Sequence, residues 1–162
     1  MKIKKLFTGI SLIEKKFDRN QTYYYLKTPN VSIIVAKTKN KFLVISQKRI
    51  PINKVTYEFP GGIIDNKSNP MNSAKTELYE ETGYKCIRSP QKLFSIYPEP
   101  GRLDCKYFCF FTDKIIKINK PEKGIKLHLF SKSKILEMIK KDKFDHACHV
   151  YAFLAYLNKH DG

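Results

Sequence analysis

Acidic residues are scarce in this chain of 162 residues, which has 15 aspartates and glutamates against 31 lysines and arginines. The formal net charge of +16 would attract polyanions such as nucleic acid, nucleotides or anionic membranes. Arginine, which binds phosphates and base edges better than lysine does, is also scarce. Because the basic residues are mostly lysines spread along the chain, the charge favours a solvated basic surface over a dedicated nucleic-acid site.

Long apolar runs are absent as well. No stretch approaches the ~18 consecutive apolar residues of a membrane-spanning helix, so we expect no membrane protein. The basic start and short apolar run of residues 1–16 are similar to a signal peptide. This segment lacks a small-residue cleavage site, however, and charge returns at Glu14. We therefore expect a cytoplasmic protein.

The four cysteines form no C-x-x-C pair, which argues against a zinc site. Cys105 and Cys109 are four residues apart in an expected strand and would face the same side. We interpret them as buried, reduced thiols.

Repeats, low-complexity segments and linkers are also missing, so we expect one domain over residues 1–162 with its own core. Alternation and turn residues predict strands at 9–17, 22–27, 31–37, 41–47, 92–98, 104–112 and 125–130. A helix should run from an N-cap at Asn69 to Gly83, and two more should close the chain at 133–141 and 146–159. This order lacks regular βαβ alternation and predicts an α+β fold.

The few acids are concentrated in "AKTELYEETGY", residues 74–84. On a helix Glu77, Glu80 and Glu81 share one face, where like charges repel and where the helix dipole near the C-terminus disfavours them. Helix propensity therefore does not explain the cluster. A solvated acidic patch would be the simplest interpretation of the cluster alone. Three carboxylates on one face also suit a hard divalent cation such as Mg2+ or Mn2+.

The surrounding sequence, "EFPGGIIDNKSNPMNSAKTELYEETGY", resembles the signature of the Nudix hydrolases, G-x5-E-x7-R-E-U-x-E-E-x-G-U, where U is a bulky apolar residue. The matching residues are Gly62, Glu77, Leu78, Glu80, Glu81, Gly83 and Tyr84, with no insertion between them. There are two departures, because Ser68 stands at the first glutamate of the signature and Thr76 at its arginine. In the family this arginine helps to orient the helix carboxylates, so the departures concern catalytic rate more than fold.

The resemblance implies a Nudix fold, an α/β/α sandwich with a mixed β-sheet flanked by helices and an N-terminal antiparallel strand extension. It also implies two or three Mg2+ or Mn2+ ions held by Glu77, Glu80, Glu81 and the carbonyl group of Gly61. Residues 1–30 would form the strand extension, through which relatives usually form homodimers.

The flanking residues resemble the ADP-ribose and ADP-sugar pyrophosphatase branch, which reads Q-x-R and then E-x-P-x-G. Here these positions are filled by Gln47, Arg49, Glu58, Pro60 and Gly61, and a proline that marks the branch is matched by Pro100. The resemblance implies hydrolysis of ADP-ribose or a related nucleoside diphosphate sugar to AMP and a sugar phosphate. Arg49, Glu58 and Pro100 are the predicted substrate-binding residues, since an arginine can bind a phosphate in a bidentate manner.

The general base of this branch is a glutamate in the loop before the last strand, which suggests Glu122 here, with Glu80 assisting. Glu99 and Asp104 are reserve candidates. His146 and His149 are three residues apart on an expected helix, but no third metal ligand is evident, so packing or capping is the favoured interpretation. His128 is interpreted as structural.

Two alternatives remain open at this level. The charge of +16 would also suit RNA 5′ ends or dinucleoside polyphosphates as substrates of the same chemistry. Ser68 and Thr76 would suit a Nudix-fold module that binds nucleotides or RNA with little turnover, although such a module has no need of three clustered glutamates.

Overall fold

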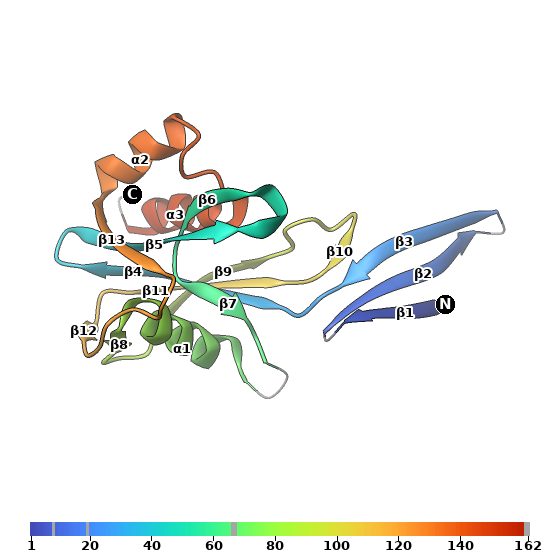
Figure 1. Cartoon of the computed structure of the whole chain (residues 1–162), viewed down its shortest axis with the longest axis horizontal. Helices are drawn as coiled ribbons and strands as arrows, with labels where there is room; N and C mark the ends of the chain where they lie inside the picture. Colours follow the sequence, from blue (N-terminus) through green and yellow to red (C-terminus); the bar gives the residue numbers. More distant parts are fainter. Residues whose placement is uncertain (8, 19, 66–67, 161–162) are drawn as a thin grey trace.

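The computed structural model describes residues 1–7, 9–18, 20–65 and 68–160 (Figure 1). The strands are β1 (Lys2–Phe7), β2 (Ile10–Asp18), β3 (Gln21–Lys27), β4 (Val31–Thr38), β5 (Lys41–Arg49), β6 (Lys54–Glu58), β7 (Gly61–Ile63), β8 (Tyr84–Cys86), β9 (Gln91–Ile96), β10 (Leu103–Asp104), β11 (Tyr107–Thr112), β12 (Ile115–Lys117) and β13 (Lys126–Ser131). The helices are α1 (Pro70–Thr82), α2 (Lys132–Lys140) and α3 (Ala147–His160), and Ile50–Ile52 form a short 3-10 turn.

The central sheet is mixed, with the strand order β13-β5-β4-β11-β9. β11 runs parallel to β4, whereas β13 and β9 pair antiparallel with β5 and β11. β4 and β5 pair only next to their connecting turn, through Lys37 with Phe42 and Thr38 with Lys41. Beyond that point they separate, so that β5 pairs with β6 and β4 pairs with β7. The segment between β6 and β7 therefore crosses between two diverging strands. The Pro-Gly-Gly sequence lies at its end, with Pro60 in the crossing and Gly61 and Gly62 in β7.

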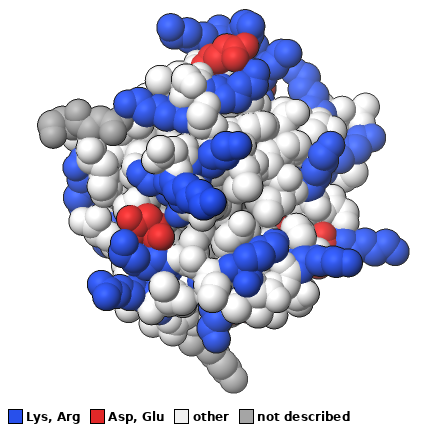
Figure 2. All heavy atoms as spheres, turned by 90° about the vertical axis from the view of Figure 1, so that its left-hand side faces the viewer, with Lys and Arg blue, Asp and Glu red and all other residues white. Residues whose placement is uncertain are grey.

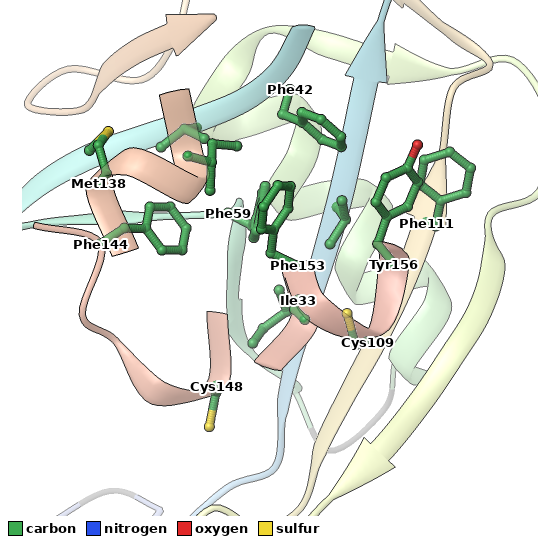
Figure 3. Packing of buried hydrophobic residues seen from close by; sticks show 14 residues of the cluster. Ile33, Phe42, Phe59, Cys109, Phe111, Met138, Phe144, Cys148, Phe153 and Tyr156 are labelled. Carbon is green, nitrogen blue, oxygen red and sulfur yellow. The ribbon is translucent and has the colours of Figure 1, made fainter. Parts of the chain in front are cut away.

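Helices cover both faces of this sheet (Figure 1). On one face, α2 and α3 pack on a large core that contains Phe42, Phe59 and Phe153 (Figure 3). On the other face, Ala74 and Leu78 of α1 pack against a second buried cluster on β4, β5 and β11. The predicted α+β fold of a mixed sheet flanked by helices is thus confirmed.

Local signals in the sequence define the ends of α1. The side chain of Asn69 accepts a hydrogen bond of 2.8 Å from the backbone N–H of Asn72, and Pro70 occupies the first turn. Gly83 ends the helix with φ 70°, where a Cβ atom would lie 2.0 Å from the carbonyl oxygen of Asn119. These boundaries agree with the sequence-based prediction.

Two strand predictions were wrong. Residues 104–112 do not form one strand, because β10 pairs with β3 while β11 begins only at Tyr107 and pairs with β4. Cys105 and Cys109 therefore do not share a strand, although both thiols are buried and unpaired. The first strand is also not the one at Ile10, since β1 precedes it and pairs with β2.

The strands β1, β2 and β3 form an extension that projects from the rest of the molecule (Figure 1). This N-terminal antiparallel extension was predicted. All six residues of β1 are exposed, and Phe17 on β2 is 79% exposed. None of the helices in the described ranges combines the length and apolar content needed to cross a membrane.

Candidate active site

The start of β7, directly after the crossing from β6, lies against the carboxylates of α1. The backbone N–H of Gly61 donates a hydrogen bond of 2.9 Å to Oε2 of Glu81. The carboxylate of Glu77 fills the space beside Gly62, where a Cβ atom would come within 2.2 Å of Glu77 Oε1. Glu81 is buried, Glu77 is half-buried and Glu80 is exposed, so the three carboxylates form a graded series from the interior to the solvent.

The surroundings of Glu77 and Glu81 disfavour the ionised form of both carboxyl groups. Burial raises the pKa of Glu81 to about 8, against the hydrogen bond from Gly61, and the charges of Glu77 and Glu58 add to the increase. Burial also raises the pKa of Glu77 to about 7, with further contributions from Glu80, Glu122 and Asp65. Carboxylates whose pKa values are raised by burial and by mutual repulsion gain strongly from a cation placed between them.

The donor set therefore fits a hard divalent cation, which prefers carboxylate and carbonyl oxygens. Glu77, Glu80 and Glu81 are the residues that could hold it, together with the carbonyl group of Gly61. Sequence reasoning missed Asp65, whose charge acts on Glu77 and which the signature loop carries three residues before Ser68. The one feature that could have identified Asp65 from the sequence is its position, because it is an acidic residue inside the signature.

The two departures from the signature occupy different surroundings. Thr76 is exposed and lines a surface cavity with Lys75, Tyr79 and Lys85. Ser68 is half-buried, and its hydroxyl group donates to the carbonyl oxygen of Asn69. The positive charge that acts on Glu81 comes instead from Arg49, which lies on β5 and not on α1.

The loop that carries Glu122 is attached to the C-terminal end of α1. The backbone N–H of Glu122 donates to the carbonyl oxygen of Glu80 at 2.9 Å, and the N–H groups of Ile118 and Asn119 donate to the carbonyl oxygen of Gly83. The side chain of Glu122 also contributes to the raised pKa of Glu77. The structure thus brings this predicted residue to the glutamate cluster.

Arg49 and Glu58 form a bidentate ion pair across β5 and β6. Nε of Arg49 donates to Oε1 of Glu58 at 2.8 Å, and Nη2 donates to Oε2. The hydroxyl group of Thr56 donates to the same Oε1 atom at 2.5 Å. Burial alone would raise the pKa of Glu58, but the hydrogen bonds from Arg49 and Thr56 lower it to about 2. Glu58 is therefore a buried carboxylate that stays ionised and holds the arginine.

His149 of α3, and His146 just before this helix, add two histidines to this pair. Nδ1 of His149 accepts a hydrogen bond of 3.0 Å from the backbone N–H of Phe59, and its Nε2 lies 3.7 Å from Oε2 of Glu58. Burial, and then the neighbouring His146, lower the pKa of His149 to about 3, so the ring is neutral near pH 7. A neutral ring that accepts at Nδ1 carries its proton on Nε2, which faces the carboxylate.

Glu58, His146 and His149 place one potential metal-binding atom each within 4.8 Å of one another. The third ligand that the sequence did not reveal is thus present, but its chemistry does not fit a metal. Both oxygens of Glu58 are bound by Arg49, and Nε2 of His149 carries a proton. A ligating histidine normally donates its second N–H to an acceptor, whereas His149 accepts there. We interpret this cluster as support for Arg49.

Comparison with known proteins decides the family. Residues 26–151, more than half of the chain, match the family described as NUDIX domain. The chain belongs to the Nudix family. The resemblance that the signature indicated is thereby confirmed, and the matched segment contains the glutamate cluster, Arg49 and Glu122.

Relatives and solved structures extend this comparison. The chain is 27% identical over 85 residues to an ADP-ribose pyrophosphatase of Bacillus subtilis, covering 52% of this chain and 45% of that protein. It is 26% identical over 110 residues to a CMP-5'-(N-acetyl-N-hydroxy-3-aminopropyl)phosphonate hydrolase of Streptomyces rubellomurinus, covering 66% and 53%. It is 35% identical over 88 residues to a methanol dehydrogenase activator of Bacillus methanolicus, covering 54% and 42%.

The chain thus spans about half the length of these curated relatives. The crystal structure of an ADP compounds hydrolase shares the fold, with a TM-score of 0.77 and 15% identity, covering 93% of this chain and 86% of that one. The predicted resemblance to the ADP-ribose pyrophosphatase branch therefore agrees with a sequence relative, and the solved structure agrees with the fold.

In this Nudix chain a cavity of about 460 Å³ connects the two groups of residues. Gly61 and Gly62 line it on one side, and Arg49, His146 and His149 line it on another. Most of its remaining wall is apolar, as is typical of small-molecule sites. Its other lining residues are Ile10, Thr28, Pro29, Val31, Ile33, Ile63, Leu103, Cys105 and Tyr107.

Pro100, the third predicted substrate-binding residue, lies elsewhere. It lines a neighbouring cavity of about 520 Å³ beside the N-terminal extension, together with Phe17, Tyr23 and Tyr97. The reserve candidates differ in position. Asp104 lines this neighbouring cavity, whereas the carbonyl group of Glu99 accepts from the N–H of Arg102 in the turn before β10.

Proposed function

We propose that this chain hydrolyses the pyrophosphate bond of ADP-ribose or a related nucleoside diphosphate sugar, giving AMP or another nucleoside monophosphate and a sugar phosphate. The observation that carries the proposal is the meeting of the α1 carboxylates with Gly61 and Gly62 at the wall of a cavity that also contains Arg49. The similarity to an ADP-ribose pyrophosphatase supports the substrate class.

The glutamate cluster would hold two or three divalent cations. When bound, Mg2+ or Mn2+ ions at Glu77, Glu80, Glu81 and the carbonyl group of Gly61 would neutralise the pyrophosphate oxygens and acidify the attacking water. Because Glu77 and Glu81 repel each other in a buried site, the folded chain gains stability from this neutralisation. Pre-arranged charge of this kind costs no reorganisation at the moment of reaction.

Water would attack one phosphorus atom, and the bond from that phosphorus to the bridging oxygen would break. Glu122 would accept the proton of the water, since its loop is held at the C-terminal end of α1 beside Glu80. Arg49 would bind a phosphate group with the N–H groups that Glu58 leaves free. We propose that Glu58 acts through Arg49, because its carboxylate is only 1% exposed.

Two further features complete the proposal. The four free thiols, three of them buried, fit a reducing compartment such as the cytoplasm. The exposed apolar residues of the N-terminal extension fit a homodimer in which this surface is covered by a second copy of the chain.

RNA 5′ ends are a weaker candidate substrate. Figure 2 shows lysines and arginines spread over one face of the molecule, with few acidic residues between them and no single stripe. A channel that follows an RNA backbone would concentrate basic residues along one path. On this face the distribution instead resembles a solvated basic surface.

The test is release of AMP from ADP-ribose with Mg2+ or Mn2+, with GDP-mannose, diadenosine polyphosphate and 5′-triphosphorylated RNA measured in parallel. Glu81→Gln should abolish turnover, and Asp113→Asn, an exposed carboxylate after β11, should not. Glu122→Gln should lower kcat by about 10²- to 10⁴-fold, as expected for loss of a general base. Turnover confined to RNA or dinucleotides would replace the proposed substrate, and binding without turnover of any substrate would indicate a binding module.

A further inference from the structure

A second, smaller cavity adjoins the one that contains Gly61 and Gly62. It has a volume of about 260 Å³, and Arg49 and His146 line both cavities. Its other lining residues are Pro51, Ile52, Thr56 and Asp145. Sites for drug-sized ligands measure ~300–1,000 Å³, so this cavity suits a single sugar ring better than a whole nucleoside.

Arg49 lines both cavities, and part of its guanidinium group is free to donate hydrogen bonds to a ligand. A guanidinium group has five N–H bonds, and Glu58 takes the one on Nε and one on Nη2. Both N–H bonds on Nη1 and the second one on Nη2 have no hydrogen-bond partner among the residues that the structure describes. Because Thr56 and His149 hold Glu58 in place, the arginine is fixed before any ligand binds.

The remaining polar groups of this cavity suit hydroxyl groups. The carboxylate of Asp145 has no ion-pair partner among the described residues, and adjacent sugar hydroxyls are natural donors to a carboxylate. Nδ1 of His146 is buried without a hydrogen-bond partner in the described part of the chain. Burial lowers the pKa of His146, so the ring is neutral near pH 7 and can pair with a hydroxyl group. Pro51 and Ile52 add an apolar surface for the face of the sugar ring.

We propose that this smaller cavity binds the sugar of a sugar phosphate, with Arg49 on the phosphate and Asp145 and His146 on the sugar hydroxyl groups. This inference rests on the proposed function in one respect. It takes the bound sugar to be the sugar that a nucleoside diphosphate sugar carries on its second phosphate. The sugar is the group by which this chain would distinguish nucleoside diphosphate sugars from other pyrophosphates.

The experiment measures binding in the absence of metal, so that it does not depend on hydrolysis. Dissociation constants of ribose 5-phosphate, inorganic phosphate and AMP are determined by calorimetry for the wild type, Asp145→Ala and Arg49→Lys. Asp113→Ala is the matched control, because its exposed carboxylate lies outside both cavities. Thermal unfolding verifies that each variant is folded.

Asp145→Ala should weaken ribose 5-phosphate about 10-fold, as expected for a lost hydrogen bond to a charged group, and leave inorganic phosphate unchanged. Arg49→Lys should weaken the binding of both ribose 5-phosphate and inorganic phosphate, because a lysine cannot bind a phosphate in a bidentate manner. Equal effects of Asp145→Ala on the two ligands, or no binding of ribose 5-phosphate to the wild type, would overturn the proposal. A loss confined to AMP would place the nucleoside in this cavity and would overturn it as well. Retained, Asp145-dependent sugar phosphate binding in a protein that does not hydrolyse ADP-ribose would contradict the proposed function alone.

Discussion

The carboxylate of Glu77 occupies the space in which any side chain at position 62 would lie. A Cβ atom on Gly62 would come within 2.2 Å of Oε1, 2.6 Å of Cδ and 2.9 Å of Oε2 of Glu77. The glycine therefore allows the backbone of β7 to approach α1 so closely that Glu77 faces the proposed metal site.

Gly62→Ala should separate activity from stability. The atoms in conflict are the end of a flexible side chain, so the new methyl group displaces the Glu77 carboxylate at little cost in folding. We expect a loss of ADP-ribose hydrolysis of about 10- to 100-fold, the range for disturbed metal-site geometry. The melting temperature of the metal-free protein should stay nearly constant. Gly101→Ala is the control, because a Cβ atom there meets nothing closer than 3.3 Å. Full activity of Gly62→Ala would argue against a metal-binding role for Glu77.

The stability gained from Mg2+ should increase with pH. Folding raises the pKa of Glu77 to about 7 and that of Glu81 to about 8, from the 4.5 of the unfolded chain. The native state therefore retains protons that the unfolded state loses, and these groups lower the unfolding free energy of the metal-free protein as pH rises from 4.5 towards 8. Mg2+ competes with these protons, so it should stabilise strongly at pH 8.5 and hardly at pH 5.5.

Thermal unfolding with and without Mg2+ at these two pH values measures this effect. In the double variant Glu77→Gln/Glu81→Gln, the stability of the metal-free protein should no longer decline with pH through these two groups. Mg2+ should no longer stabilise this variant. The single control variant Glu137→Gln, at an exposed position of α2, should alter neither difference. An equal stabilisation by Mg2+ at both pH values would contradict the coupling between metal binding and these two glutamates.

Sequence reasoning succeeded where the signal was local. Asn69, Pro70 and Gly83 define α1 through capping and backbone conformation, and the periodicity of the helix alone places the glutamates on one face. It could not reveal the separation of β4 from β5, because this depends on where β6 and β7 pair.

Contacts between distant parts of the chain were equally hidden. Phe59 and His149 are far apart in sequence, yet the backbone of one donates to the ring of the other. The break in the predicted strand 104–112 has the same origin, since β10 leaves the central sheet to pair with β3. Tertiary pairing overrode an apolar alternating pattern that would have allowed a continuous strand.

His149→Phe should weaken substrate binding by loosening the Glu58–Arg49 pair. The replacement removes the acceptor for the N–H of Phe59, which leaves a buried donor unpaired at a cost of about 1–3 kcal/mol. It also removes the Nε2 group that faces Glu58. We expect a lower melting temperature together with a KM for ADP-ribose about 5- to 10-fold higher, since an arginine held less firmly binds phosphate less well.

His149→Gln should restore much of the KM, because its side chain offers both an acceptor and a donor. His160→Gln is the control, since that histidine lies at the other end of α3 and lines neither cavity. If His149→Phe lowered the melting temperature without changing KM, the histidine would serve packing only.

The N-terminal extension should hold two copies of the chain together. Its exposed apolar side chains are Ile3, Leu6, Phe7, Phe17, Tyr23 and Tyr24. A projecting extension with such an exposed apolar surface is unfavourable in water, and the burial of apolar surface, at ~25 cal/mol per Å², favours association. Light scattering should give the mass of a dimer for the wild type and of a monomer for the double variant Phe7→Ser/Phe17→Ser.

Leu154→Ser is the matched control, because this leucine is also exposed but lies on α3, and it should remain dimeric. The cavity at Gly61 is lined by Ile10 of β2, so the extension contributes to the site. Because a partner that covers the extension would also hold Ile10 in place, the monomeric variant should have a higher KM for ADP-ribose. A wild-type monomer with full activity would contradict this role of the extension, and an active monomeric variant would restrict the extension to assembly.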